Sequence, residues 1–142
     1  MIKKQVSVFL ENKIGRLNKV TQILGKNGIN ISAFSIADTS DFGILRIIVP
    51  DPEKALKVLK ENNFSAKTTD VVFMNSPNKP GALAKALQIL NSEEVSIEYM
   101  YAFSMNEETA VIVIRPSDPA LCLEKLKKHQ DELISGGDHY II

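Results

Sequence analysis

Two copies of a short pattern bring together the residues best suited to bind a small molecule. The first copy runs Asn12-Lys-Ile-Gly-Arg-Leu17 and the second runs Asn78-Lys-Pro-Gly-Ala-Leu83. The glycine in each allows a sharp turn and lets a ligand approach the backbone without a side chain in the way. A helix that begins there presents free amides and the positive end of its dipole, which together can hold a carboxylate. The asparagine adds a side chain that can both donate and accept hydrogen bonds.

A polar residue follows each asparagine at the same distance, Asn30 in the first copy and Ser96 in the second. We expect these residues to begin a strand whose edge carbonyls can hold an ammonium group. A carboxylate site beside an ammonium site describes a free amino acid. The alternative is that Gly-x-Leu only starts a helix, but two copies with the same spacing favour the ligand interpretation. The predicted ligand-binding residues are Asn12, Ile14, Gly15, Asn30, Asn78, Pro80, Gly81 and Ser96.

Catalytic constellations are scarce in this sequence. His129 and His139 have no metal-ligand spacing and are expected to be structural. Cys122 is the single cysteine, and it is expected to be a small buried hydrophobe. The double glycine Gly136-Gly137 is interpreted as a loop, because no helix follows to present amides to a phosphate. The acids in two expected hairpins are interpreted as turn residues and solvated charge, not as a general acid and base: Asp38, Asp41, Glu107 and Glu108. The sequence therefore predicts neither an enzyme nor a metal site, and no cofactor.

Composition narrows the class of partner. In 142 residues, hydrophobic side chains make up 44% and charged side chains 24%, as in ordinary globular proteins. Seventeen basic residues balance seventeen acidic ones, so no overall charge favours nucleic acid or anionic lipid. The N-terminus lacks the apolar segment of a signal peptide, and no apolar run reaches membrane-spanning length. We expect a cytoplasmic protein that binds neither nucleic acid nor membrane.

The sequence repeats itself at an offset of 66 residues. Apolar positions of the expected first helix in one copy fall on apolar positions in the other, and Pro50 falls on Pro116. One inserted residue then aligns Asp51-Pro52 with Asp118-Pro119. A chance match of six residues would not preserve the helical apolar positions and the turns between them. We therefore predict two domains, residues 1–69 and residues 70–142.

Each repeat predicts the order strand, helix, strand, strand, helix, strand. Alternation around residues 5–10 indicates a strand, and apolar residues at 17, 20, 23 and 24 indicate a helix that faces a core. Asn27-Gly28 predicts a left-handed helix stop, and Asp51 followed by Pro52 predicts a capped second helix. The remaining strands are expected at residues 29–37, 44–49 and 65–69.

This order predicts an α+β fold of two tandem βαββαβ ferredoxin-like units, with antiparallel sheets and both helices on one face. Residues 65–69 are expected to run directly into the strand at Val71-Val-Phe-Met74. The third strands, residues 44–49 and 110–114, are apolar on both sides. In a sheet with one solvent-exposed face, strands are expected to alternate apolar and polar residues. We therefore expect the helix-free face to be partly covered, either by the other half or by a second chain. The aromatic residues Tyr99, Tyr101 and Phe103 lack the basic flanks of an RNA-binding sheet and are expected in a core or interface.

The pattern Glu11-Asn-Lys-Ile-Gly-Arg-Leu17 followed by Gly28-Ile-Asn-Ile31 resembles the ACT domain family, as does its second copy with Val95-Ser-Ile97. The resemblance covers essentially the whole chain and implies a βαββαβ fold that binds amino acids or related metabolites where two domains pair. It implies ligand contacts by Asn12, Gly15 and Asn30, and by their equivalents Asn78, Gly81 and Ser96. The chain departs from the family at Ile14, where proline is usual, and at Ser96 and Glu94, where asparagine and glycine are usual. We expect the two sites to differ in affinity.

Three functions follow from these features. The leading hypothesis is an amino-acid sensor, active as a homo-oligomer such as a dimer, that alters a partner when its ligand binds. The second is a regulatory or adaptor subunit of an amino-acid biosynthetic enzyme, which acts mainly by protein–protein contact. The third is a small ferredoxin-like enzyme, which lacks an arrangement of acid, base and nucleophile to support it.

Overall fold

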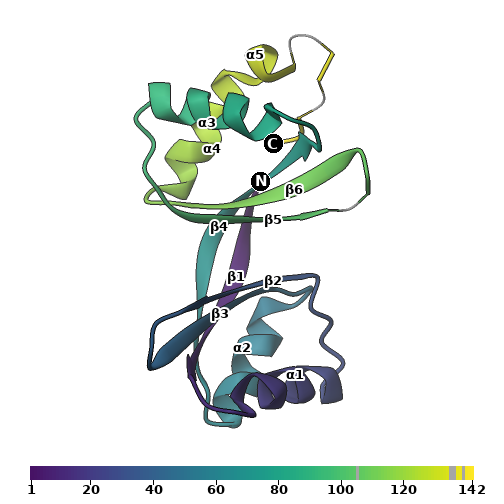
Figure 1. The fold of residues 1–142 in the computed structure, drawn as a ribbon, viewed down its shortest axis with the longest axis vertical. Helices are drawn as coiled ribbons and strands as arrows, with labels where there is room; N and C mark the ends of the chain where they lie inside the picture. Colours follow the sequence, from purple (N-terminus) through teal and green to yellow (C-terminus); the bar gives the residue numbers. More distant parts are fainter. Residues whose placement is uncertain (105, 135–136, 139) are drawn as a thin grey trace. The chain divides into compact units, whose positions relative to one another are not determined.

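A computed structural model of the chain describes residues 1–104, 106–134, 137–138 and 140–142 (Figure 1). The elements follow one another in the order strand, helix, strand, strand, helix in each repeat, with a short helix added near the C-terminus. Their bounds are β1 Ile2–Glu11, α1 Arg16–Lys26, β2 Ala33–Asp38, β3 Phe42–Ile48, α2 Pro52–Glu61, β4 Ser65–Pro77, α3 Ala82–Ser92, β5 Ile97–Ser104, β6 Thr109–Pro116, α4 Pro119–Lys128 and α5 Gln130–Ile134.

The chain divides into two compact units. The first half is Lys4–Thr69, and the second half is Asp70–Ile142 together with Met1–Lys3. Each is a ferredoxin-like unit in which two long helices lie on one face of an antiparallel sheet, α1 and α2 in the first and α3 and α4 in the second (Figure 1). β4 is one continuous strand that belongs to both halves, which confirms that residues 65–69 run directly into residues 71–74.

In the first half the strand order is β2-β3-β1-β4. Val6 and Val8 of β1 pair with Ile47 and Leu45 of β3, so their side chains share the face that the helices cover. These side chains pack with the apolar stripe of α1 and the inner face of α2 into one core. Its helical members are Val20, Ile23, Leu24, Ala55, Val58 and Leu59.

In the second half the strand order is β5-β6-β4, and the place beside β4 is shared by the two ends of the chain. The Phe73 amide donates to the Met1 carbonyl at 2.7 Å. Asn75 follows Phe73 by two residues on β4. It exchanges backbone hydrogen bonds of 2.7 and 3.0 Å with Ile141, near the C-terminus. Within the described residues, the expected closing strand is represented by a bridge at Ile141. His139, expected to be structural, lies outside the described residues.

The predicted helix signals hold in detail. Asp51 accepts a hydrogen bond from the Lys54 amide at 3.1 Å, and Asp118 accepts one from the Leu121 amide at 3.0 Å. A proline follows each aspartate, in the first turn of the helix where no amide hydrogen is needed. α1 ends as expected at Asn27, followed by Gly28 with φ of +69°. The fully buried Cys122 confirms its interpretation as a small hydrophobe, and burial raises the pKa of its thiol to about 11.

Two expectations about the elements are wrong. β2 begins at Ala33, not at residue 29, because Ile29 packs into the core from an irregular segment and the ladder to β3 starts at Ala33 opposite Ile48. Leu17 and its equivalent Leu83 are each 41% exposed instead of facing the core. They lie in the first turns of α1 and α3, beside the two glycines, so the apolar periodicity misassigned them to the interior.

Aromatic side chains line the helix-free face of β5. Tyr101 pairs with Val113 and Phe103 pairs with Val111, which places both aromatic residues opposite the core side. The Phe103 ring meets the Phe73 ring edge to face, with centroids 6.3 Å apart. These positions are half-buried, and their counterparts in β2 of the first half are small residues: Ala33, Ser35 and Ala37.

Candidate functional site

The two glycine turns have almost the same backbone geometry. Gly15 immediately precedes α1 with φ of 88° and ψ of −12°, and Gly81 immediately precedes α3 with φ of 86° and ψ of −13°. Both lie in the left-handed region, which costs a residue with a Cβ about 1–2 kcal/mol. The turn itself therefore favours glycine at both positions, and the duplication has preserved the turn in both halves.

Space is open at both turns. A Cβ built on Gly15 or on Gly81 would meet no heavy atom within 4 Å, so the protein's own side chains do not fill this position. The second and third amides of α1, on Leu17 and Asn18, have no backbone acceptor within the described part of the chain. The same is true of Leu83 and Ala84 in α3. Each turn thus combines free amides with the positive end of a helix, an arrangement that suits an anion such as a carboxylate.

Both predicted asparagines hold the turn to the neighbouring hairpin. Asn12 Nδ2 donates to the Ser40 carbonyl at 3.3 Å, and its backbone amide donates to the Asp41 carbonyl at 3.0 Å. Asn78 repeats this with the Glu107 carbonyl at 3.4 Å and a backbone bond of 2.8 Å to the next residue. The backbone and side-chain nitrogens of each asparagine therefore position the turn. The side-chain oxygen of each asparagine remains as a polar group that can accept a hydrogen bond. The sequence did not reveal this positioning role.

The other predicted residues border the turns on the surface. Ile14, fully exposed, and Pro80, also exposed, directly precede the two glycines. Asn30 is exposed and lies three residues before β2, so it does not open that strand as expected. Ser96 lies one residue before β5, and its carbonyl accepts from the Ser117 amide at 3.0 Å. Because β2 begins late, the two polar residues occupy different local settings.

One group of contacts near the second turn has no counterpart in the first half. Tyr140, which is buried, donates from its hydroxyl to the Ala82 carbonyl at 2.9 Å. Lys79, inside the second turn motif, forms an ion pair with Asp138. Lys85 of α3 donates to the Leu133 carbonyl at 2.8 Å. The C-terminal segment therefore braces the start of α3, and only the excess length after α4 in the second repeat could have hinted at it.

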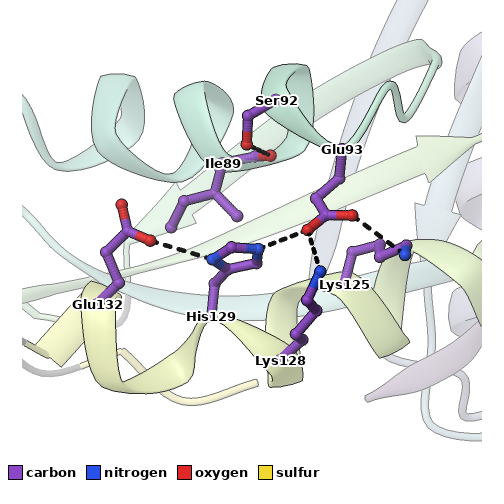
Figure 2. A network of polar contacts seen from close by, with 7 residues as sticks. All are labelled: Ile89, Ser92, Glu93, Lys125, Lys128, His129 and Glu132. Carbon is purple, nitrogen blue, oxygen red and sulfur yellow. Dashed lines mark hydrogen bonds and ion pairs between the residues drawn. The ribbon is translucent and has the colours of Figure 1, made fainter.

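A network of charged groups joins the end of α3 to α4 (Figure 2). Glu93 Oε1 lies 2.7 Å from Lys128 Nζ and 2.6 Å from His129 Nε2, while Glu93 Oε2 lies 3.1 Å from Lys125 Nζ. Hydrogen bonds from Lys128, His129 and Lys125 lower the pKa of Glu93 to about 2. His129 Nδ1 also lies 3.0 Å from Glu132, and the two carboxylates, Glu93 first, raise the pKa of His129. Both ring nitrogens are occupied, which agrees with a structural histidine.

Two other features are absent from the described residues. These residues hold no cluster of three or more histidine, cysteine, aspartate or glutamate side chains that could bind a metal ion. None of the described helices is long and apolar enough to cross a bilayer. The two glycine turns remain as the candidate site, and they occur once in each half with the same geometry.

The chain thus consists of duplicated ferredoxin-like units, each of which opens its first helix from a glycine turn. The chain belongs to the ACT domain pair family, whose sequence model matches residues 1–136. It is similar to protein BT0572 from Bacteroides thetaiotaomicron, with 55% identity and a TM-score of 0.87 over 92% of this chain and 90% of that one. No curated protein matches the chain.

The fold is also similar to that of two regulatory subunits of aspartate kinase. The one from Thermus thermophilus, in its ligand-free form, has 17% identity and a TM-score of 0.63 over 90% of this chain and 96% of that chain. The one from Thermus flavus has 18% identity and the same TM-score over 90% and 94%. At this identity the likeness concerns the fold.

Proposed function

We propose that this chain is a regulatory protein that binds a small metabolite, an amino acid or a close relative, at its two glycine turns. The observation that carries the proposal is the pair of matching turns, each with open space and free helix amides, in a member of the ACT domain pair family. Duplicated geometry of this kind is more than a helix start requires, because a helix can begin from many caps without glycine.

The carboxylate of the ligand is assigned to the free amides of Leu17 and Asn18 in the first turn, and to those of Leu83 and Ala84 in the second. Backbone amides at a helix start point toward the ligand and add the favourable field of the dipole. No lysine or arginine is needed for this contact, which suits a site that must release its ligand as concentrations fall.

The ammonium group is assigned to acceptors beside each turn. The Asn12 side chain uses its nitrogen on the Ser40 carbonyl, which leaves Oδ1 as an acceptor, and Asn78 is arranged in the same way. The exposed residues Asn30 and Ser96 are proposed as the second source of acceptors. Ile14 and Pro80 border the ligand at the turn.

We further propose that the chain acts as a homodimer and that pairing completes the sites. Apolar side chains are exposed where a second chain would cover them: Ile14 and Leu17 at the first turn, and Phe34 and Ile36 on β2. β2 pairs only with β3 within the described first half, so its other edge is available for strand pairing. A ligand bound where two copies meet favours the paired arrangement by its difference in affinity for the two states.

The exposed edge of β2 also favours a second candidate, an adaptor subunit of a metabolic enzyme. Phe34 is 64% exposed and Ile36 is 47% exposed, and both lie on the edge strand of the first half. Similarity in fold to regulatory subunits of aspartate kinase supports this class of partner. The adaptor would bind an enzyme through β2, with weak ligand binding on its own.

Calorimetric titration with each of the twenty amino acids tests the proposal. We expect saturable binding of one or a few amino acids, lost in the double variant Gly15→Ala with Gly81→Ala, because a Cβ strains each turn. Gly25→Ala is the matched control: it replaces a glycine inside α1, where the added methyl meets nothing within 4 Å. Absence of binding at millimolar concentration by folded protein would contradict the proposal.

Light scattering with and without the bound amino acid separates the two candidates. The sensor predicts a dimer that is strengthened by ligand and weakened by Phe34→Asp on β2. The adaptor predicts that Phe34→Asp leaves the free protein unchanged and instead prevents its recovery with a larger enzyme.

A further inference from the structure

A cavity of about 210 Å³ lies in the first half, beside the start of α1. Its lining includes the apolar residues Phe9, Leu10, Phe42 and Phe64 and the polar residues Arg16, Asn63 and Ser65. Glu11 also borders it, but that carboxylate is exposed and lies 2.8 Å from Lys13 Nζ. We infer that this cavity is a binding site for a small organic carboxylate, held by the Arg16 guanidinium. It is separate in chemistry from the amino-acid sites proposed above.

The first argument is the state of the Arg16 side chain. Its guanidinium lies over the Phe64 ring, with the central carbon 4.6 Å from the ring centroid. Its Nε is shielded from solvent and has no hydrogen-bond partner among the described residues. An arginine is always charged, and a buried donor without an acceptor costs about 1–3 kcal/mol. The aromatic ring thus holds the charged side chain at the wall of the cavity, with its Nε shielded and unpaired.

The second argument is the match between the cavity and one ligand class. A guanidinium fork binds a carboxylate through two parallel hydrogen bonds, a geometry that a spherical ion does not use. Three phenylalanine walls suit an apolar body attached to that carboxylate. The volume is below the range of about 300–1,000 Å³ for drug-sized ligands, so the occupant is small. Asn63 and Ser65 can donate to the second carboxylate oxygen or to a further oxygen of the ligand.

The third argument is the contrast with the second repeat. The position of Arg16 corresponds to Ala82, which brings no charge. There the carbonyl of Ala82 accepts a hydrogen bond from the buried Tyr140 hydroxyl at 2.9 Å. The second half therefore lacks the guanidinium at this position. The proposed site belongs to the first half alone, whereas the glycine turns occur in both.

Nitrogen-15 NMR tests this site with probes that carry no ammonium group. The probes are benzoate, 4-methyl-2-oxopentanoate and, as a simple anion, inorganic phosphate. We expect the organic carboxylates to shift the Arg16 Nε–H signal and the amides of Asn63, Phe64 and Ser65 in a saturable way. Phosphate can also engage a guanidinium fork, but it has no apolar body to contact the phenylalanines, so it is expected to bind more weakly than the organic carboxylates. Equal binding of phosphate would overturn the assignment to an organic carboxylate, and absence of any saturable shift would overturn the site itself.

Three variants make the test specific. Arg16→Ala is expected to weaken benzoate binding at least about tenfold, since a charge-assisted bidentate contact is lost. Arg16→Lys keeps the charge and the helix but lacks the planar fork, so it is also expected to weaken binding if the fork is the contact. Lys19→Ala removes a cation from the same helix outside the cavity and should leave the affinity unchanged. Unchanged affinity in folded Arg16→Lys and Arg16→Ala would refute the role of Arg16.

The outcome is distinguishable from that of the amino-acid proposal. Amino acids are expected to shift the turn amides of both halves, including Leu83 and Ala84, and to do so in Arg16→Lys. Benzoate binding without any amino-acid binding would support the Arg16 cavity and reject the turn sites. Amino-acid binding at the turns without benzoate binding would support the turn sites and reject the Arg16 cavity.

Discussion

The two halves end their first helices with the same backbone but with different side chains. After α1, Asn27 donates from its side chain to the Ile23 carbonyl at 2.8 Å, and Gly28 adopts φ of +69°. After α3, the equivalent positions are Glu93 and Glu94, and Glu94 adopts φ of +56° despite its Cβ. Glu93 instead binds the side chains of Lys125 and Lys128 in α4 and of His129, the residue that follows α4 (Figure 2). The backbone conformation at the helix end is therefore the same in both halves, whereas the side-chain interactions that stabilise it differ.

The starts of the same two helices differ in the residues that surround the glycine turn. The first turn is bordered by the open cavity and Arg16, and the second is braced by Asp138 and Tyr140 from the C-terminal segment. The glycine geometry itself is common to both. We therefore expect the two turns to bind the same kind of group with different affinity, because their surroundings differ in contacts and charge.

The largest expected effect comes from the two cores. Leu24 in α1 and its equivalent Leu90 in α3 are both almost fully buried, and truncation of each to alanine is expected to cost about 2–5 kcal/mol. Urea denaturation followed by far-ultraviolet circular dichroism measures the free energy of unfolding. If β4 couples the halves, each variant shifts a single transition; two separate transitions, one per variant, would show that the halves unfold independently.

The left-handed positions after the helices should respond in opposite directions. Glu94→Gly removes a Cβ from φ of +56° and is expected to stabilise the protein by about 1 kcal/mol, whereas Gly28→Ala should destabilise it by a similar amount. Nothing lies within 4 Å of a Cβ at Gly28, so the loss reports the backbone alone. Chemical denaturation of the pair provides the measurement. A destabilising Glu94→Gly would mean that the Glu94 side chain makes a contact that outweighs the strain.

The brace at the second turn predicts a smaller loss. Tyr140→Phe keeps the ring in the core but removes the hydroxyl that bonds the Ala82 carbonyl, at an expected cost of about 1 kcal/mol. For a chain of this length that corresponds to a fall in Tm of roughly 2–4 °C. Equal Tm values for wild type and Tyr140→Phe would show that this hydrogen bond does not stabilise the protein.

The charged network predicts a stability difference that depends on pH. Lys128, His129 and Lys125 lower the pKa of Glu93 from 4.5 to about 2, so its contribution is present above 4.5 and lost as the pH falls toward 2. Glu93 and Glu132 raise the pKa of His129 above 6.5, so that contribution is complete below 6.5 and lost as the pH rises through the folded pKa. The Tm difference between wild type and Glu93→Gln should therefore be largest between pH 4.5 and 6.5. Asn27→Asp, at the equivalent position in α1, should not reproduce this profile.

Much of the fold follows from local signals in the sequence. The duplication, the aspartate–proline caps and the glycine stop after α1 each act through neighbouring backbone atoms, which a sequence pattern can capture. Leu17 and Leu83 were misassigned because helical periodicity reports which residues share a face, and the first turn of each helix extends past the core. The start of β2 was placed early because Ile29 is buried without belonging to the strand.

The candidate site could be predicted only in part, for a related reason. Glycine at positions 15 and 81 follows from the turn, but the hydrogen bonds of Asn12 and Asn78 to the hairpins join residues nearly thirty positions apart. The brace by Tyr140 and the cavity at Arg16 likewise depend on segments distant in sequence. Such contacts leave no periodic trace in the sequence, and so they appear first in the structure.

The central claim is that both glycine turns bind an amino acid through free helix amides. Proton–nitrogen correlation spectra of the labelled protein, recorded while each of the twenty amino acids is added, test it most directly. The account predicts that a binding amino acid shifts the amides of Leu17, Asn18, Leu83 and Ala84, and that Gly25→Ala leaves these shifts intact. Shifts confined to other parts of the chain, or no shifts at millimolar concentration, would contradict it.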